Sequence, residues 1–214
     1  WVKKTYNLKG DVRCSLWMNG VHLTYYVKDS KGKKVLRIYR PGLRSEEQIG
    51  FELDQLQHLE SSGIPVSTPL KNRAGGFQVP VRLPDGDTVA VLFTFAEGFF
   101  KMKPVAWVGR ELGALLARMH SAQDQFQLSA PSLPLNVDGL TVRPIKSLGP
   151  YRSSFGKDWL WLRKVAKKIK KELSVLPRKQ PFYGLIHGDA HFGNLHYSPL
   201  EKSYILFDLD LTTS

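Results

Sequence analysis

The sequence predicts a two-lobed α+β fold, in which an antiparallel sheet with one helix is followed by a mainly helical half. Alternating strand patterns fill the first hundred residues, and turn signals such as Met18-Asn19-Gly20 separate them. After Glu97-Gly98, apolar residues recur at helical spacing instead. We therefore expect an N-terminal nucleotide-binding lobe over residues 1–95, a hinge at 96–98 and a C-terminal catalytic lobe over 99–214, with the functional site in the cleft between them.

The N-terminal half is predicted to form short strands and one helix. Strands are expected at residues 12–17, 21–28, 34–40, 76–83 and 88–95. Ser45 followed by Gln48 is a capping-box signature, so a helix is expected to begin there. Gly63 and Pro65 are expected to end it. Its apolar stripe consists of Ile49, Leu53, Leu56 and Leu59.

Two helices are predicted in the second half. The first spans residues 104–120 and the second, which is strongly basic, spans residues 157–176. Four prolines between them predict an irregular connection: Pro131, Pro134, Pro144 and Pro150. The apolar stripe of the basic helix consists of Leu162, Val165, Ala166, Ile169, Leu173 and Leu176.

Composition limits the classes of protein to which the chain can belong. With 42% hydrophobic residues among 214 it can form a core, and no apolar run approaches the ~20 residues that span a bilayer. The single Cys14 cannot form an internal disulfide and no signal peptide is visible, so we expect a cytoplasmic protein with no membrane partner. Because the chain opens on Trp1 rather than Met, its native start is expected upstream.

The formal charge of +12 raises the question of an anionic partner. Much of this charge lies between Arg163 and Lys171, on the polar side of the predicted basic helix. We interpret this side as a solvated face, which makes nucleic acid an unfavoured partner. The alternative is a basic RNA-binding module with an inactive catalytic core, in which Trp159 and Trp161 would stack on bases.

The segment from His187 to Asp208 carries the candidate chemistry. Residues 195–198 and 204–207 are expected to pair as a hairpin that sets Asn194 opposite Asp208. An amide oxygen and a carboxylate at that spacing are ligands that Mg²⁺ accepts beside a nucleotide. Asp189 precedes Asn194 by five residues on the same loop, and could accept a proton from an attacking hydroxyl.

Two other interpretations of this segment were open. Asp189, Asn194 and Asp208 could be loop-capping and turn residues. That interpretation does not explain why the predicted loop and hairpin would bring all three together. The histidines of the same segment, with Asp189, could instead form a zinc or two-metal hydrolase site. These histidines are His187, His191 and His196.

The motif from His187 to Asn194, followed by Phe207-Asp208-Leu209-Asp210, resembles the aminoglycoside phosphotransferase and choline kinase superfamily, whose fold is that of protein kinases. The resemblance runs from about Gly20 to Asp210. Residues 38–66 resemble one branch in particular, the bacterial stress-response kinase A group of Ser/Thr kinases. The implied activity is transfer of the γ-phosphoryl group of ATP, with Mg²⁺, to a hydroxyl of a protein Ser/Thr or of a small molecule such as an aminoglycoside or choline-like metabolite.

The resemblance also implies roles in the catalytic loop. Asp189 would be the catalytic base and His187 its structural support. Asn194 and Asp208 would be the metal ligands. No role is implied for Asp210, after which the pattern of the stress-response branch is not kept.

Further roles are implied in the N-terminal lobe. Arg37 would contact the α- and β-phosphates, Glu52 would pair with Arg37, and Phe95 with Ala96 would meet adenine at the hinge. The residues support the pairing independently, because Glu52 lies on the apolar stripe of its helix and Arg37 on an apolar strand face. A charge in either place needs a partner, or must reach solvent on its own.

The resemblance is not complete. The first hairpin turn holds only Gly20, so a glycine-rich phosphate loop is not expected there. The superfamily continues beyond the metal ligands with helices that build the acceptor site, whereas this chain stops at Ser214. The sequence is therefore expected to be a truncated form whose own activity is open, and it does not name the acceptor.

Overall fold

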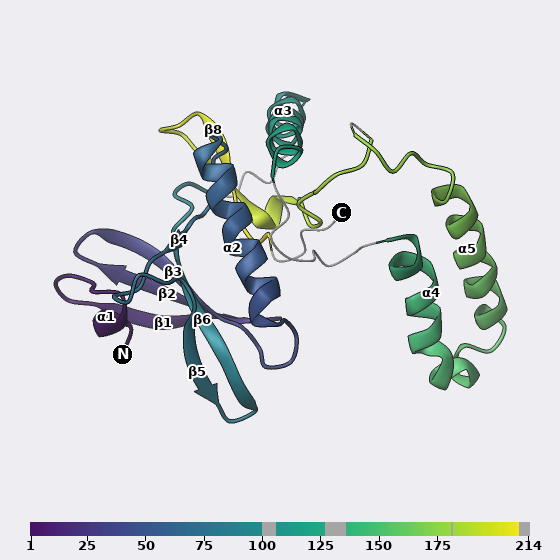
Figure 1. Cartoon of the computed structure of the whole chain (residues 1–214), viewed down its shortest axis with the longest axis horizontal. Coiled ribbons are helices and arrows are strands. Elements are labelled where there is room, and N and C mark those ends of the chain that lie inside the picture. Colours follow the sequence, from purple (N-terminus) through teal and green to yellow (C-terminus); the bar gives the residue numbers. More distant parts are fainter. Residues whose placement is uncertain (100–105, 127–135, 181, 210–214) are drawn as a thin grey trace.

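The computed structural model describes residues 1–99, 106–126, 136–180 and 182–209 (Figure 1). Within these residues, the N-terminal part is a six-stranded antiparallel sheet in the order β1-β2-β3-β6-β4, with β5 also paired to β6. The strands are β1 Arg13–Asn19, β2 Leu23–Asp29, β3 Gly32–Ile38, β4 Pro69–Leu70, β5 Val79–Leu83 and β6 Gly86–Thr94.

The long helix of this part is α2, Glu46–Ser61, and it begins as the sequence predicts. Ser45 and Gln48 form a complete capping box, which satisfies two backbone N–H groups of the first turn. The predicted apolar stripe is buried along its whole length. Gly63 follows the helix with a φ of +73°, the left-handed conformation that a helix end favours.

Two features of the N-terminal part differ from expectation. The first hairpin keeps Met18 and Asn19 in the ladder, with Asn19 opposite Leu23, so its loop is Gly20 to His22 rather than the expected Met18 to Gly20. Strand β1 also contains a β-bulge between Leu16 and Met18, which strand patterns do not predict. The short helix α1, Val2–Thr5, and the two-residue strand β4 carry too little periodicity to be seen in the sequence.

A second sheet has two strands and is formed near the end of the described chain. It consists of β7 Leu195–Ser198 and β8 Ser203–Leu206, preceded by the 3-10 turn η2 Phe192–Asn194. Backbone hydrogen bonds join it to Pro65 and Ser67 on one side and to Phe99 on the other. The hairpin is thereby held against the segments that leave α2 and β6.

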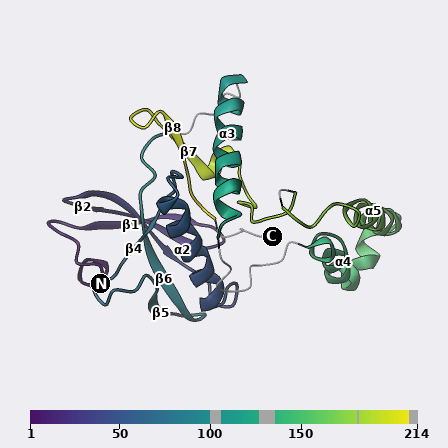
Figure 2. The same cartoon turned by 45° about the horizontal axis from the view of Figure 1, so that its top comes forward.

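The helix α3, Ala106–Gln123, confirms the first predicted helix of the second half. Val108, Leu115 and Met119 of its stripe are buried. They share one core with α2, the sheet and the β7–β8 hairpin. A second core on the other face of the sheet includes Val2 of α1. Figure 2 shows α3 beside the β7–β8 hairpin. Pro104 and Val105 fall outside the described residues.

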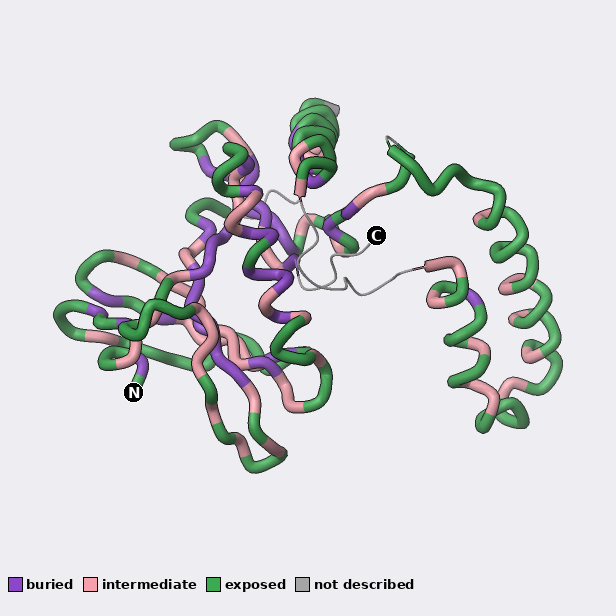
Figure 3. The backbone as a smooth tube through the Cα atoms, viewed as in Figure 1, coloured by how far each residue is buried: buried purple, intermediate pink, exposed green. Residues whose placement is uncertain are grey.

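A helical arm stands apart from these elements (Figures 1 and 3). It comprises α4 Val137–Leu148, the 3-10 helix η1 Gly149–Phe155 and the basic helix α5 Asp158–Leu173. The expected irregular connection is therefore wrong at Pro144, which lies inside α4, and at Pro150, which begins η1. Half-buried and buried residues recur at helical spacing along α4, which packs against α5. This packing outweighs the loss of the backbone hydrogen bond that Pro144, without an N–H, cannot donate. Pro131 and Pro134 fall outside the described residues.

None of the helices described is both long enough and apolar enough to cross a membrane.

Candidate active site

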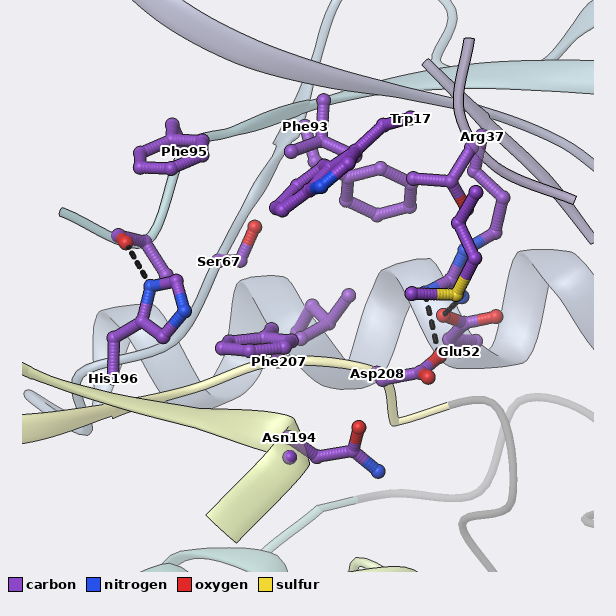
Figure 4. A pocket seen from close by; sticks show the side chains of 16 residues that line it. Trp17, Arg37, Glu52, Ser67, Phe93, Phe95, Asn194, His196, Phe207 and Asp208 are labelled. Carbon is purple, nitrogen blue, oxygen red and sulfur yellow. Dashed lines mark hydrogen bonds and ion pairs between the residues drawn. The ribbon is translucent and has the colours of Figure 1, made fainter. Parts of the chain in front are cut away.

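A cavity of about 180 Å³ lies between the sheet, α2 and the β7–β8 hairpin. Figure 4 shows that its wall is divided by chemistry. The aromatic rings of Trp17, Phe95 and Phe207 gather toward one end, together with Ala96. The charged and amide side chains lie toward the other end, and they are Arg37, Glu52, Asn194 and Asp208.

Arg37 on β3 is held between two carboxylates from distant parts of the chain. Its Nη1 lies 3.1 Å from Glu52 Oε1 on α2, and its Nη2 lies 2.5 Å from Asp208 Oδ1. The hydroxyl of Tyr39 donates to the other Glu52 oxygen at 2.8 Å. Burial, and secondly the Glu52 carboxylate, raise the pKa of Tyr39 well above its ordinary value. The predicted pairing of Arg37 with Glu52 is confirmed, and separate solvation of the two charges is excluded.

The register of the β7–β8 hairpin corrects one expectation. Leu195 pairs with Leu206, and the N–H of Phe207 donates to the Asn194 carbonyl at 3.1 Å. Asn194 therefore lies opposite Phe207 rather than Asp208, because the loop is one residue shorter than expected. A slip by one residue normally sends a side chain to the other face of a sheet.

Asp208 nevertheless lines the same cavity as Asn194. Its φ of +65° interrupts the extended backbone after β8, so the alternation of side chains along the strand does not continue to this residue. An Asp tolerates this conformation better than most residues do. The two candidate metal ligands are thus brought together by a backbone turn and not by direct pairing.

Asp189 and Asn194, the candidate catalytic base and a candidate metal ligand, are directly joined. The Asn194 amide nitrogen donates to the Asp189 carboxylate at 2.8 Å and to its backbone carbonyl at 3.0 Å. With its nitrogen so engaged, this amide presents its oxygen as the atom available to a cation. Asp189 itself is half-exposed and is connected to the cavity wall through Asn194.

His187 is buried behind this loop. Its Nδ1 accepts from the N–H of Asp189 at 3.4 Å, and its Nε2 lies 3.2 Å from the Phe207 carbonyl, to which it can donate. These two contacts tie the loop to the residue that precedes Asp208. Burial lowers the pKa of His187 below its ordinary value, because desolvation disfavours the imidazolium.

The hydrolase interpretation finds no support in this geometry. Within the described ranges, no three His, Cys, Asp or Glu side chains converge on one point. His196 is turned toward the Ala96 carbonyl and His187 toward Phe207. The Nε2 of His191 lies 3.5 Å from the Asp189 carboxylate, which makes a pair and not a cluster. Asp210 falls outside the described residues.

Sequence reasoning missed the residues that shape the aromatic end of the cavity. Trp17 stacks on Phe95, with ring centroids 6.1 Å apart and an interplanar angle of 29°. Ser67 and His196 also line the wall: Ser67 contacts Thr94 at the end of β6, and His196 contacts Ala96 in the segment that follows it. Trp17 lies at the β-bulge of β1. A bulge could have marked this residue, but the alternating pattern of a strand sequence does not reveal where a bulge lies.

Comparison with known proteins places the chain among phosphotransferases. An uncharacterized protein of Synechocystis sp. is 30% identical over 210 residues, covering 98% of this chain and 58% of that protein. A homoserine kinase of Parvibaculum lavamentivorans is 32% identical over 158 residues, or 72% of this chain and 45% of that one. Among solved structures, amicoumacin kinase hAmiN in complex with AMP-PNP, Ca²⁺ and Ami has a similar fold, with a TM-score of 0.74 at 23% identity over 99% of this chain and 62% of that one.

The chain thus spans about 60% of the length of the first two curated relatives that it matches. The α+β fold predicted from the sequence is confirmed as that of the kinase-like phosphotransferases. The boundaries of the two lobes and the narrower resemblance to the stress-response kinase A group stay predictions. Residues 19–214 match the phosphotransferase enzyme family (APH), and the chain belongs to this family.

Proposed function

We propose that this chain carries the nucleotide site and catalytic loop of an enzyme that transfers the γ-phosphoryl group of ATP to a hydroxyl. The observation that carries the proposal is the division of one cavity into an aromatic end and a charged end, with Asp189 joined to the charged end. A nucleotide has the same division, because its base is flat and apolar while its phosphates are anionic.

The aromatic end suits a purine base. Trp17 and Phe95 offer ring faces on which a base can stack, and Phe207 adds a further apolar surface. The phosphates would then extend toward Arg37, whose guanidinium can hold phosphate oxygens by paired hydrogen bonds. At about 180 Å³ the cavity is smaller than most small-molecule sites, so we expect its wall to move apart when a nucleotide enters.

The charged end fits Mg²⁺. Asn194 presents an amide oxygen and Asp208 a carboxylate to the same cavity, and hard cations of this kind prefer such oxygen ligands. When bound, the cation would neutralise charge on the phosphates during transfer. Arg37 holds Oδ1 of Asp208, so a bound cation could take Oδ2 of the same carboxylate, or Oδ1 once Arg37 releases it. After that release, Arg37 would keep Glu52 and turn its freed nitrogen toward the phosphates.

Asp189 is the group that we assign to the acceptor. Its carboxylate receives the Asn194 amide on one oxygen, which fixes its orientation. The other oxygen can accept the proton of an acceptor hydroxyl as that hydroxyl attacks the γ-phosphorus. His187 supports the loop from behind through the N–H of Asp189.

The relatives favour a small-molecule alcohol as the acceptor. They include a homoserine kinase and an amicoumacin kinase, whose names state small-molecule substrates. A protein Ser/Thr acceptor, suggested by the stress-response resemblance, is the second possibility. A nucleotide substrate and the single exposed Cys14 both suit the cytoplasm, which we propose as the compartment.

Substitution of Asp189 by Asn tests this function. The variant keeps the shape of the side chain but removes its basic oxygen. We expect turnover of saturating MgATP to fall roughly 10²- to 10⁴-fold, while ATP affinity stays nearly the same. The assay should use the protein as its gene encodes it, with ATP hydrolysis to water as the readout until an acceptor is found.

Asp85→Asn is the matched control, because Asp85 is an exposed carboxylate in the turn between β5 and β6. Its turnover should equal that of the wild type. Equal turnover in Asp189→Asn and the wild type would show that Asp189 is not the base.

A further inference from the structure

His196 on β7 lies at the aromatic end of the cavity, where it meets the segment that follows β6 (Figure 4). The side chain is buried, and its ring centroid lies 6.0 Å from that of Phe95 and 5.0 Å from that of Phe207. Its Nδ1 is 2.6 Å from the Ala96 carbonyl oxygen. Because a carbonyl oxygen only accepts, Nδ1 must carry the hydrogen and donate it.

The segment from Thr94 to Ala96 presents a defined backbone edge. Thr94 ends β6, and in a chain that continues in this extended direction the carbonyls of residues 94 and 96 lie on one side, with the N–H of residue 96 between them. Both carbonyls are held by side chains that line the cavity. The Ser67 hydroxyl donates to the Thr94 carbonyl at 2.6 Å, and His196 donates to that of Ala96.

Purine bases would use this edge differently. Adenine carries an amino donor beside a ring-nitrogen acceptor, a pattern that fits the Thr94 carbonyl with the Ala96 N–H. Guanine carries a carbonyl acceptor beside an N–H donor, so it fits only when shifted by one group, onto the Ala96 N–H and the Ala96 carbonyl. The carbonyl that guanine requires is the one that His196 holds.

The two side chains do not release their carbonyls equally. Each carbonyl keeps a second lone pair, so the difference lies in the donor: the Ser67 hydroxyl can rotate about a single bond and leave the Thr94 carbonyl to an incoming amino group. The imidazole of His196 is rigid, buried and placed between two aromatic rings. The adenine contact therefore stays open while the guanine contact is obstructed.

We propose that His196 makes this cavity select adenine over guanine nucleotides by occupying the Ala96 carbonyl. His196 is here a positioning residue, because it acts on the base through the backbone of Ala96. The inference rests on the proposed nucleotide site and adds the choice of base to it.

Calorimetric titration of the protein as its gene encodes it with MgATP, MgGTP and magnesium tripolyphosphate tests the inference. The wild type should prefer MgATP. In His196→Leu, which cannot donate, the preference for ATP over GTP should shrink by about tenfold, the typical effect of one hydrogen bond. His196→Asn should restore the preference, because its Nδ2 can occupy the place of the imidazole Nδ1. Tripolyphosphate has no base, so its affinity should be the same in all three proteins.

His22→Leu is the matched control. His22 is buried like His196 and its Nδ1 also meets the backbone, at the N–H of Arg40, but it does not line the cavity. The ratio of ATP to GTP affinity should not change in this variant, whatever happens to its melting temperature.

The possible failures are distinct. A wild type that binds tripolyphosphate and both nucleotides equally overturns the selectivity and leaves the proposed function standing. An unchanged ratio in His196→Leu, or a lost preference in His196→Asn, also overturns it, since the hydrogen bond would then not be the cause. A wild type that binds none of the three ligands removes the proposed function itself.

Discussion

Arg37 holds the carboxylates of Glu52 and Asp208 at the same time, although all three belong to different elements. Its side chain is only 13% exposed and that of Glu52 7%, whereas the side chain of Asp208 is 36% exposed. A buried charge is costly to leave unpaired, so the Arg37–Glu52 pair is the more permanent of the two. The Asp208 contact lies in a wetter environment and is the one that can be exchanged for another ligand.

Asp208→Ala should therefore weaken the dependence of nucleotide binding on magnesium. We expect the gain in ATP affinity on adding Mg²⁺ to fall by roughly tenfold or more, since the charged ligand is lost. Calorimetry with and without Mg²⁺ measures this gain. Asp87→Ala is the control, because it removes the exposed Arg82–Asp87 pair away from the cavity. An equal gain in the wild type and Asp208→Ala would exclude Asp208 as a ligand.

His187 should make the stability of the protein depend on pH in a limited window. In the folded protein the pKa of His187 lies below the ordinary value of 6.5. Below pH 6.5 this histidine therefore binds a proton more readily in the unfolded chain than in the folded protein. The free energy of unfolding should thus fall as pH is lowered from 6.5 until the folded pKa is passed, at no more than about 1.4 kcal/mol per pH unit.

Urea unfolding between pH 7.5 and 5.5 measures this slope. His187→Gln should reduce the slope of the free energy of unfolding against pH. His120→Gln should leave this slope unchanged, because His120 is exposed. A slope that survives unchanged in His187→Gln would assign the pH dependence to other groups.

Among the elements, those with strong local signals were predicted well. The capping box at Ser45 and the stripe of α2 depend on residues within one helix, so the sequence states both. The register predicted for the β7–β8 hairpin was wrong by one residue, because it does not depend on local signals alone. The length of the loop is set by tertiary contacts of the hairpin with Pro65, Ser67 and Phe99. The helix α4 was missed because Pro144 is a strong local signal that packing overrode.

The basic helix α5 can be tested as an element. Most of its lysines are exposed, and its pairs Lys170–Asp138 and Lys168–Glu172 lie at the surface, where such pairs contribute little. Replacing Lys167, Lys168, Lys170 and Lys171 together by Gln should leave MgATP affinity within about twofold of the wild type. Calorimetry and the melting temperature measure the outcome. Nanomolar RNA binding with a steep salt dependence, lost in this variant, would instead favour the RNA-binding alternative.

On the scale of the whole molecule, the sequence predicted the charged, amide and hinge residues of the cavity wall but not how its two halves meet. Arg37, Glu52, Phe95, Ala96, Asn194 and Asp208 were all named from the sequence, and all line one cavity. Trp17, Ser67 and His196 were not named as parts of this wall, because their contacts join segments that lie far apart in the chain. Local patterns predict elements, whereas contacts of this kind depend on the assembled fold.

Gly98 lies where the two halves meet. Its φ is +138°, and a Cβ at this position would come within 2.3 Å of the Tyr197 carbonyl oxygen. The next residue, Phe99, exchanges two backbone hydrogen bonds with Tyr197 on β7, at 3.2 and 3.0 Å. Any side chain at Gly98 would therefore push β7 away from the segment that follows β6, and β7 carries His196 and directly follows Asn194.

Gly98→Ala should lower the free energy of unfolding by about 2 to 4 kcal/mol, from backbone strain and overpacking together. It should also weaken MgATP binding, because Ala96 and Asn194 would no longer face each other correctly across the cavity. Gly75→Ala isolates the strain, since Gly75 has a φ of +89° but nothing within 4 Å of its Cβ position. This control should lose only about 1 kcal/mol and bind MgATP normally. Urea unfolding measures the free energy of unfolding of both variants, and calorimetry measures their MgATP affinity. Equal losses of stability and affinity in the two variants would show that the contact with Tyr197 is not what joins the two halves.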